Sequence, residues 1–220
     1  YRLLRGVSRA KDQSYVLYQL TQAQLAHLLL PVGGFEKPEI RERAAEAGLA
    51  SAHQADSQDI CFIPDGDYVR FLRDYGGVTP EPGDFVDASG RVLGRHRGLV
   101  CYTAGQRKGL GVSADRPLYV IAKNAGSNTV LLGDDAELFS GALLASHVNW
   151  IAGGAPGEKV RCTAKTRYSQ KECEAVVTPL APGGAHVELL TPQRAVTAGQ
   201  AVVFYDGDEV LGGGTIERAL

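Results

Sequence analysis

Four short stretches of the sequence combine side chains that could react or bind a ligand. They are Lys11-Asp-Gln-Ser-Tyr15, Asp56-Ser-Gln-Asp-Ile-Cys61-Phe-Ile63, Tyr102 to Gly111, and Lys165-Thr-Arg-Tyr168. Lys and Arg attract phosphates, tyrosine rings stack on bases, and glutamine amides can bond to base edges. Each stretch also has a simpler interpretation. The first could be a helix cap, the second an inert core thiol, the third a solvated turn and the fourth a pair of surface residues. The residues alone leave both interpretations open.

Cys61 is the candidate nucleophile among four cysteines. The other three, Cys101, Cys162 and Cys173, fall in runs that predict strands, where a thiol usually serves as a small apolar side chain. Several Asp residues lie close to Cys61 in the sequence, and nearby carboxylates favour the neutral thiol over the reactive thiolate. Activation of Cys61 therefore requires basic residues folded over it, a bound substrate or another domain.

Several common sites are missing from the sequence. There is no CxxC, HxxxH or HExxH pattern, so no metal site is predicted. There is no GxxxxGK[ST] loop, and Gly109 to Ala114 fits a dinucleotide fingerprint without the strand and helix that it needs. The residues thus give no means of binding ATP unaided. No apolar run approaches the ~20 residues of a membrane helix, and no secretory signal opens the chain, so neither a membrane partner nor a disulfide scaffold is expected.

Charge is segregated along a chain whose net charge is only −2. Residues 1–11, 91–108 and 159–171 hold 14 of the 23 Lys and Arg residues and no Asp or Glu. Attraction to phosphate is local, because salt screens it within about 10 Å. The three basic segments therefore favour a polyanion such as RNA as a partner. The alternative is that they are ordinary solvated faces.

The hydrophobic pattern divides the chain near residue 78. Before it we expect helices within Tyr15–Leu30 with a Thr21 capping box, over Glu39–Ala47, and over Tyr68–Tyr75 with an Asp67 cap, and a short strand-like run at Ile60–Ile63. After it, short apolar runs alternate with turns, which is typical of a small barrel or sandwich. The expected strands are 84–86, 91–93, 118–122, 129–132, 160–165, 172–178, 186–190, 201–204 and 210–211, and the Gly212–Gly214 run indicates a bulge or a close backbone approach.

Five ordered motifs resemble those of the bacterial tRNA-specific 2-thiouridylases. They are KDQSYVLY, DSQDICFIPDGDY, GLVCYTAGQRKGLG, CTAKTRY and AVTAGQAVVFYDGDEVLGGGTI. Together they extend over nearly the whole chain and correspond to the C-terminal two-thirds of that family. Because the chain begins at Tyr1 and contains no methionine, we expect it to be a piece of a longer protein.

The resemblance implies an α+β fold in three parts. These are a helical remnant of an ATP-pyrophosphatase-type nucleotide domain (residues 1–66), a small β-rich central domain (67–137) and a C-terminal antiparallel β-barrel (138–220). Family members bind ATP through an N-terminal SGGxDS loop that this chain lacks.

The resemblance also implies a reaction and its residues. Family members are cytoplasmic enzymes that replace O2 of the tRNA wobble uridine with sulfur in an ATP-dependent reaction. Sulfur comes from a cysteine desulfurase or a relay protein and is carried as a persulfide, here on Cys61, and a resolving cysteine and a disulfide bond are part of the reaction. The tRNA contacts carried over are Lys11, Asp12, Gln13, Arg167, Tyr168 and Gln200. The other reading is a non-catalytic RNA-binding module.

Overall fold

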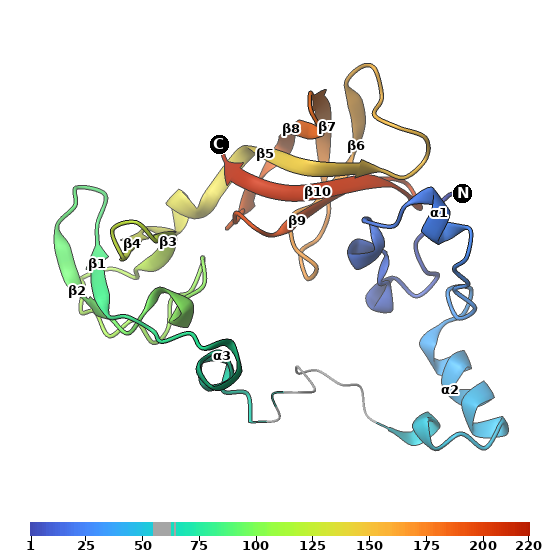
Figure 1. Cartoon of the computed structure of the whole chain (residues 1–220), viewed down its shortest axis with the longest axis horizontal. Helices are drawn as coiled ribbons and strands as arrows, with labels where there is room; N and C mark the ends of the chain where they lie inside the picture. Colours follow the sequence, from blue (N-terminus) through green and yellow to red (C-terminus); the bar gives the residue numbers. More distant parts are fainter. Residues whose placement is uncertain (55–62, 64) are drawn as a thin grey trace. The chain divides into compact units, whose positions relative to one another are not determined.

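A computed structural model describes residues 1–54, 63 and 65–220. It confirms the α+β class with a C-terminal barrel. Contacts within the chain group residues 1–54 with 140–220, and residues 55–139 form a second unit. The described helices are α1 (Gln22–Leu25), α2 (Lys37–Glu46) and α3 (Tyr68–Gly76), with 3₁₀ helices at Arg9–Lys11, Ser14–Leu17, Ala50–His53, Leu99–Cys101 and Asp135–Leu138 (Figure 1).

The helix ends follow local side-chain chemistry. Thr21 and Gln24 form the predicted capping box of α1, and Asp67 caps α3 by accepting from the backbone N–H of Arg70 at 2.9 Å. Gly77 ends α3 in the left-handed conformation. The helical region at Tyr15–Leu30 is shorter than predicted, because Leu28, Leu29 and Leu30 are exposed and no packing sustains the helix beyond α1.

The second unit contains a mixed four-stranded sheet. Its strands are β1 (Gly83–Val86), β2 (Val92–His96), β3 (Tyr119–Asn124) and β4 (Thr129–Gly133), in the order β2-β1-β4-β3. Only the β1–β4 pair is parallel. His96 is buried, and its Nδ1 accepts from the backbone N–H of Gly98 while its Nε2 bonds to the carbonyl of Asn128, both at 3.0 Å. This side chain links β2 to the turn before β4.

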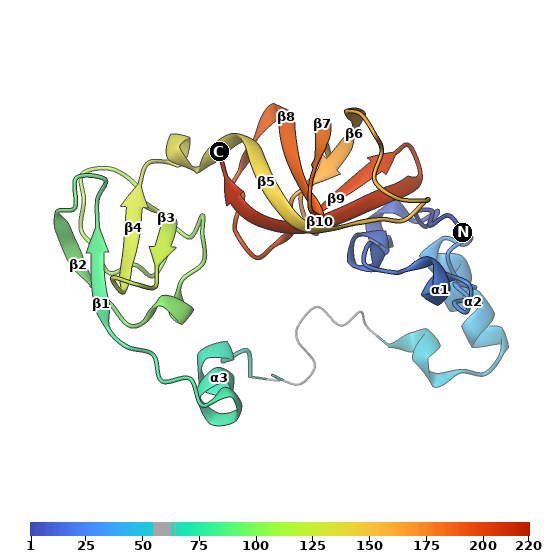
Figure 2. The ribbon, with the colours of Figure 1, turned by 45° about the horizontal axis from the view of Figure 1, so that its top comes forward.

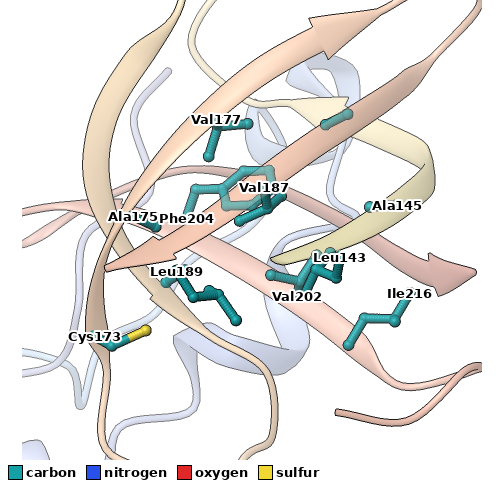
Figure 3. Close-up of a cluster of buried hydrophobic side chains, with 12 residues drawn as sticks. Leu143, Ala145, Cys173, Ala175, Val177, Val187, Leu189, Val202, Phe204 and Ile216 are labelled. Atoms are coloured by element: carbon teal, nitrogen blue, oxygen red, sulfur yellow. The ribbon is translucent and has the colours of Figure 1, made fainter. Parts of the chain in front are cut away.

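Six strands close the barrel. They are β5 (Phe139–Trp150), β6 (Val160–Lys165), β7 (Cys173–Leu180), β8 (Gly184–Arg194), β9 (Ala201–Asp206) and β10 (Glu209–Ala219), in the order β10-β5-β8-β7-β6-β9 (Figure 2). Alternate side chains point inward, as the period of a strand requires. Figure 3 shows Phe204 beside Val177 and Val187 in this core, with Cys173 at its edge.

Two features of the barrel differ from expectation. The long strand β5 escapes the sequence pattern, because its outward positions include small and apolar residues and alternation is weak. The run Gly212–Gly214 lies inside β10 rather than between short strands. A Cβ on Gly213 would lie 2.6 Å from the carbonyl oxygen of Val202 and 2.7 Å from the ring of Tyr18, so the predicted close approach is present.

The N-terminal segment packs on the barrel. Leu3 is buried, and its carbonyl accepts from the backbone N–H of Val210 at 2.9 Å. Three arginines of this segment pair with carboxylates of the barrel or its turns: Arg2 with Glu209, Arg5 with Glu172, and Arg9 with Asp208. Much of the positive charge in residues 1–11 therefore attaches this segment to the barrel.

Candidate nucleic-acid interface

Gln13 and Tyr168, from two separate motifs, are in direct contact. The side-chain amide of Gln13 donates to the hydroxyl of Tyr168 at 2.5 Å. Gln13 precedes the 3₁₀ helix Ser14–Leu17, and Tyr168 lies in the turn between β6 and β7. The contact brings the KDQ and RY motifs, which are 155 positions apart in the sequence, onto one surface.

Tyr168 is 44% exposed, and a second tyrosine packs against its ring. Tyr15 meets it edge to face, with the ring centroids 6.0 Å apart. Lys165 Nζ lies 5.8 Å from the centroid of each ring, within cation–π range. Tyr15 is buried, which raises its pKa to about 12, and its hydroxyl donates to the carbonyl of Ala201 at 2.8 Å. The exposed ring of Tyr168 can stack on a base, because the buried Tyr15 holds it in place. Lys165 lies close enough to bind the phosphate of the same nucleotide.

Asp12 organises the loop that carries Gln13. Its carboxylate accepts from the backbone N–H groups of Gly6 (2.9 Å) and Ser14 (3.2 Å) and from the hydroxyl of Ser14 (2.6 Å). The carbonyl of Lys11 accepts weakly from Gln13 at 3.5 Å. The structure thus gives Asp12 a local bonding role, whereas the N-cap residue of the 3₁₀ helix Ser14–Leu17 is Gln13, without a side-chain cap bond.

Arg167 and Gln200 are linked through the turn before β9. Arg167 Nη2 donates to the carbonyl of Ala195 at 2.8 Å and to Thr197 Oγ1 at 2.9 Å. The backbone N–H of Gln200 donates to the carbonyl of Thr197 at 3.2 Å, and the side chain of Gln200 is exposed. One series of contacts therefore joins the four residues. Gln13 bonds to Tyr168, whose neighbour in the sequence is Arg167, and Arg167 bonds to the turn that carries Gln200.

An ion pair between the largely buried Arg5 side chain and the partly exposed Glu172 supports this surface and has no signal in the sequence. The guanidinium of Arg5 makes two hydrogen bonds to the Glu172 carboxylate, one of them at 2.8 Å, and stacks on the Tyr205 ring at 3.7 Å. The Arg5 bond, followed by a bond from Thr163, lowers the pKa of Glu172 to about 2. Arg5 and Glu172 are 167 positions apart, so only the fold reveals the pair.

Cys61 lies outside the described residues. The three other cysteines are free thiols. Burial raises the pKa of Cys162 to about 12 and raises that of Cys173 as well. Both thiols lie in or against the barrel core, as expected for small apolar side chains.

The stretch Tyr102 to Gly111 forms an internally bonded turn. Gln106 accepts from the backbone N–H of Thr103 at 3.0 Å and donates to the carbonyl of Lys108 at 2.9 Å. Arg107 and Lys108 are exposed at its tip. In the same basic segment, Arg91 and Arg95 pair with Asp87 and Asp84. The segment is therefore partly neutralised, and Arg97 is exposed in it as well as Arg107 and Lys108.

The N-termini of the longer described helices are poor sites for the phosphates of ATP. The two helices of nine or more residues have their first turns occupied by their own carboxylates, Glu39 bonding to the N–H of Glu36 in α2 and Asp67 capping α3. A phosphate would be repelled there. Among residues 1–54, 63 and 65–220, no three His, Cys, Asp or Glu side chains gather as metal ligands. In the described part of the chain, no helix has the length and apolar character to cross a membrane.

Three family models match consecutive parts of the chain. They are described as a tRNA methyl transferase HUP domain (residues 1–65), a tRNA methyl transferase PRC-barrel domain (69–134) and an aminomethyltransferase beta-barrel domain (140–216). Together they extend over nearly the whole sequence.

Full-length relatives are named tRNA-specific 2-thiouridylase MnmA. The one from Heliobacterium modesticaldum is 53% identical over 100% of this chain and 58% of its own length. Those from Acetivibrio thermocellus (49%) and Symbiobacterium thermophilum (50%) align with 99% and 98% of the chain and with 60% and 55% of their own lengths. The chain therefore spans a little more than half the length of these relatives. About half of the residues are identical along essentially the whole chain, and three domains follow in one order, so the chain belongs to the tRNA-specific 2-thiouridylase family.

Proposed function

We propose that this chain is the part of a tRNA 2-thiouridine-forming sulfurtransferase that holds the tRNA and carries the sulfur. The observation that supports it most directly is the surface on which Gln13 contacts Tyr168 while Arg167 holds the turn of Gln200. An exposed ring, amide groups and cations in one place suit an unpaired base and its phosphates. Family membership supplies the substrate class.

The finer chemistry rests on the family resemblance. In this proposal Cys61 carries sulfur as a persulfide received from a cysteine desulfurase or a relay protein, and that sulfur replaces O2 of the wobble uridine. A resolving cysteine and a disulfide bond then complete the reaction. ATP is used by the whole enzyme and is assigned to a part outside these 220 residues, because this chain lacks the SGGxDS loop through which family members bind it. The setting is cytoplasmic.

The proposed division of labour follows the three predicted parts. Residues 1–66 belong to the nucleotide domain and carry Cys61, residues 67–137 form the central domain, and residues 138–220 form the barrel. Most of the proposed tRNA surface comes from the first and third parts. Residues 1–54 and 140–220, which make up most of these two parts, belong to one compact unit.

Binding of an unmodified tRNA transcript tests the first part of the proposal. We expect binding that weakens with salt, and we expect Lys165→Ala to weaken it and to flatten the slope of log K against log salt by about 0.7–0.9. Arg73→Ala is the control, because Arg73 is an exposed cation on α3 paired with Asp74. Equal tRNA affinities for the wild type and Lys165→Ala would remove Lys165 from the interface.

Persulfide mapping tests the second part. The chain is incubated with a cysteine desulfurase and cysteine, and the persulfides are labelled and located by mass spectrometry. Label is expected at Cys61 and is expected to vanish in Cys61→Ser. Label concentrated at Cys101, Cys162 or Cys173 would overturn the assignment.

A further inference from the structure

Two turns at one end of the barrel are bonded to each other. The turn 166–170 joins β6 to β7 and carries Tyr168, and the segment 194–200 joins β8 to β9 and carries Gln200. The side chain of Gln170 accepts from the hydroxyl of the buried Thr166 at 2.6 Å and donates to the carbonyl of Arg194 at 2.9 Å. The bonds from Arg167 complete the connection between the turns.

The guanidinium of Arg167 is directed into this connection. Nη2 donates to the carbonyl of Ala195 and to the hydroxyl of Thr197, which lie 2.8 Å apart and therefore share one of its hydrogens. Nε is buried as well, with less than 1 Å² of exposed surface. A bidentate grip on a phosphate needs two adjacent guanidinium nitrogens at once. The side-on grip, which uses Nε together with Nη2, is therefore not available in the described geometry.

Ala195 shows what these bonds hold. It is buried and has a φ of 56°, a left-handed conformation that residues with a Cβ rarely adopt. Such a residue persists only when its surroundings fix it. The carbonyl of Ala195 accepts from Arg167 and from the hydroxyl of Thr197, each at 2.8 Å. These two bonds fix the unusual backbone.

The same bonds set the position of Gln200. The carbonyl of Thr197 accepts from the N–H of Gln200, and the carbonyl of Gln200 accepts from the N–H of Ile216 in β10 at 2.8 Å. Given the proposed tRNA-binding function, we infer that Arg167 is a positioning residue, which holds the Gln200 turn beside Tyr168, and that it is not a phosphate contact. Tyr168 and Gln200 then form one preorganised surface for a base.

A double-mutant cycle on tRNA binding separates the two roles. Arg167→Ala, Gln200→Ala and the double variant are titrated with an unmodified tRNA transcript over a range of salt. We expect Arg167→Ala to weaken binding about fivefold, as for one lost hydrogen bond, without changing the salt slope. We expect the double variant to bind no more weakly than the weaker single variant. A slope lower by about 0.7–0.9, with effects that multiply, would overturn the inference in favour of a phosphate contact.

Thr197→Val is the matched variant, because it keeps the shape of the side chain and removes the hydroxyl that accepts from Arg167. We expect it to weaken tRNA binding in the same direction as Arg167→Ala. If Arg167 contacts a phosphate, Thr197→Val leaves tRNA binding as in the wild type. Fluorescence of Trp150, the single tryptophan, confirms that the barrel of each variant is folded.

Amide hydrogen exchange reads the same positioning without RNA. We expect the N–H of Gln200 to exchange faster in Arg167→Ala than in the wild type, and unchanged exchange would contradict the inference. If the wild-type chain fails to bind tRNA, the proposed function fails. The exchange measurement still decides whether Arg167 holds the turn.

Discussion

The amide of Gln13 and the hydroxyl of Tyr168 are 2.5 Å apart although 155 positions separate them in the sequence. The bond gives the hydroxyl of Tyr168 a task that stacking alone does not require. It orients Gln13 and holds the Tyr168 ring in place above Tyr15.

The Tyr168 pair of variants tests that task. From the sequence alone, only the ring of Tyr168 is expected to contribute to tRNA binding, by stacking on a base, so Tyr168→Phe would leave the tRNA affinity unchanged. The structure predicts instead that Tyr168→Phe weakens tRNA binding by about 0.5–1.5 kcal/mol and Tyr168→Ala by about 1–3 kcal/mol. Titration with labelled tRNA measures both, with Tyr75→Phe as a control at an exposed tyrosine of α3. A Phe variant that binds like the wild type would show that the hydroxyl has no part in recognition.

Glu172 predicts a loss of stability in acid. Its pKa falls from 4.5 to about 2 in the folded chain, mainly through the bond from Arg5. The ionised group therefore stabilises the fold above pH 4.5, and this contribution disappears as the pH falls from 4.5 toward 2. Because the carboxylate is partly exposed, we expect only about 1–2 kcal/mol.

Thermal unfolding between pH 2 and 6 measures this contribution to stability. Glu172→Gln is expected to be less stable near pH 6 and to lose less stability than the wild type on acidification. Glu174→Gln, at an exposed position of β7 two residues further along the chain, is the control. Parallel pH curves for the wild type and Glu172→Gln would contradict the prediction.

Cys162 is predicted to react slowly in the native chain. Burial raises its pKa to about 12, so at pH 8 only about one thiol in ten thousand is ionised. Alkylation with iodoacetamide, followed by mass spectrometry, is expected to label Cys162 far faster in denaturant than in buffer, and Cys162→Ser identifies its signal. Fast native labelling of Cys162 would show that the barrel core is open to reagents.

Gly213 and Gly141 form a matched pair for testing the packing of β10. A Cβ on Gly213 would enter the space of Val202 and Tyr18, whereas one on Gly141 would meet nothing within 4 Å. We expect Gly213→Ala to lower the free energy of unfolding by about 1–3 kcal/mol and Gly141→Ala to leave it nearly unchanged. Denaturant titration followed by Trp150 fluorescence measures both. Equal stability of the two variants would mean that the backbone relaxes around the added methyl group.

Local signals account for what could be predicted from the sequence. The Thr21 box and the Asp67 cap each depend on a few adjacent residues, and both are present. Strand β5 could not be predicted in this way, because its pairing partners lie on β8 and β10 and its own alternation is weak. Cys61 itself lies outside the described residues, so its environment stays a prediction.

The residues of the candidate interface could likewise be predicted only in part from the sequence. Gln13, Arg167, Tyr168 and Gln200 come from recognisable motifs, but the sequence does not indicate that they are neighbours. Glu172 lies outside the five motifs, and Thr197 lies in one that does not indicate its contact, since their roles come from the distant residues Arg5 and Arg167. The backbone at Ala195 gives no warning either, because alanine carries no preference for its left-handed conformation.

The packing of the N-terminal segment on β10 has a consequence for biosynthesis. Leu3 bonds to Val210, so the first residues cannot reach their native partners until the last strand has left the ribosome. The intervening unit, whose sheet pairs only within residues 83–133, can form earlier. Newly made chains would then display Leu3, Tyr15 and Tyr18 to solvent for most of translation. A chaperone that binds apolar segments would have a long opportunity to bind these residues in the nascent chain.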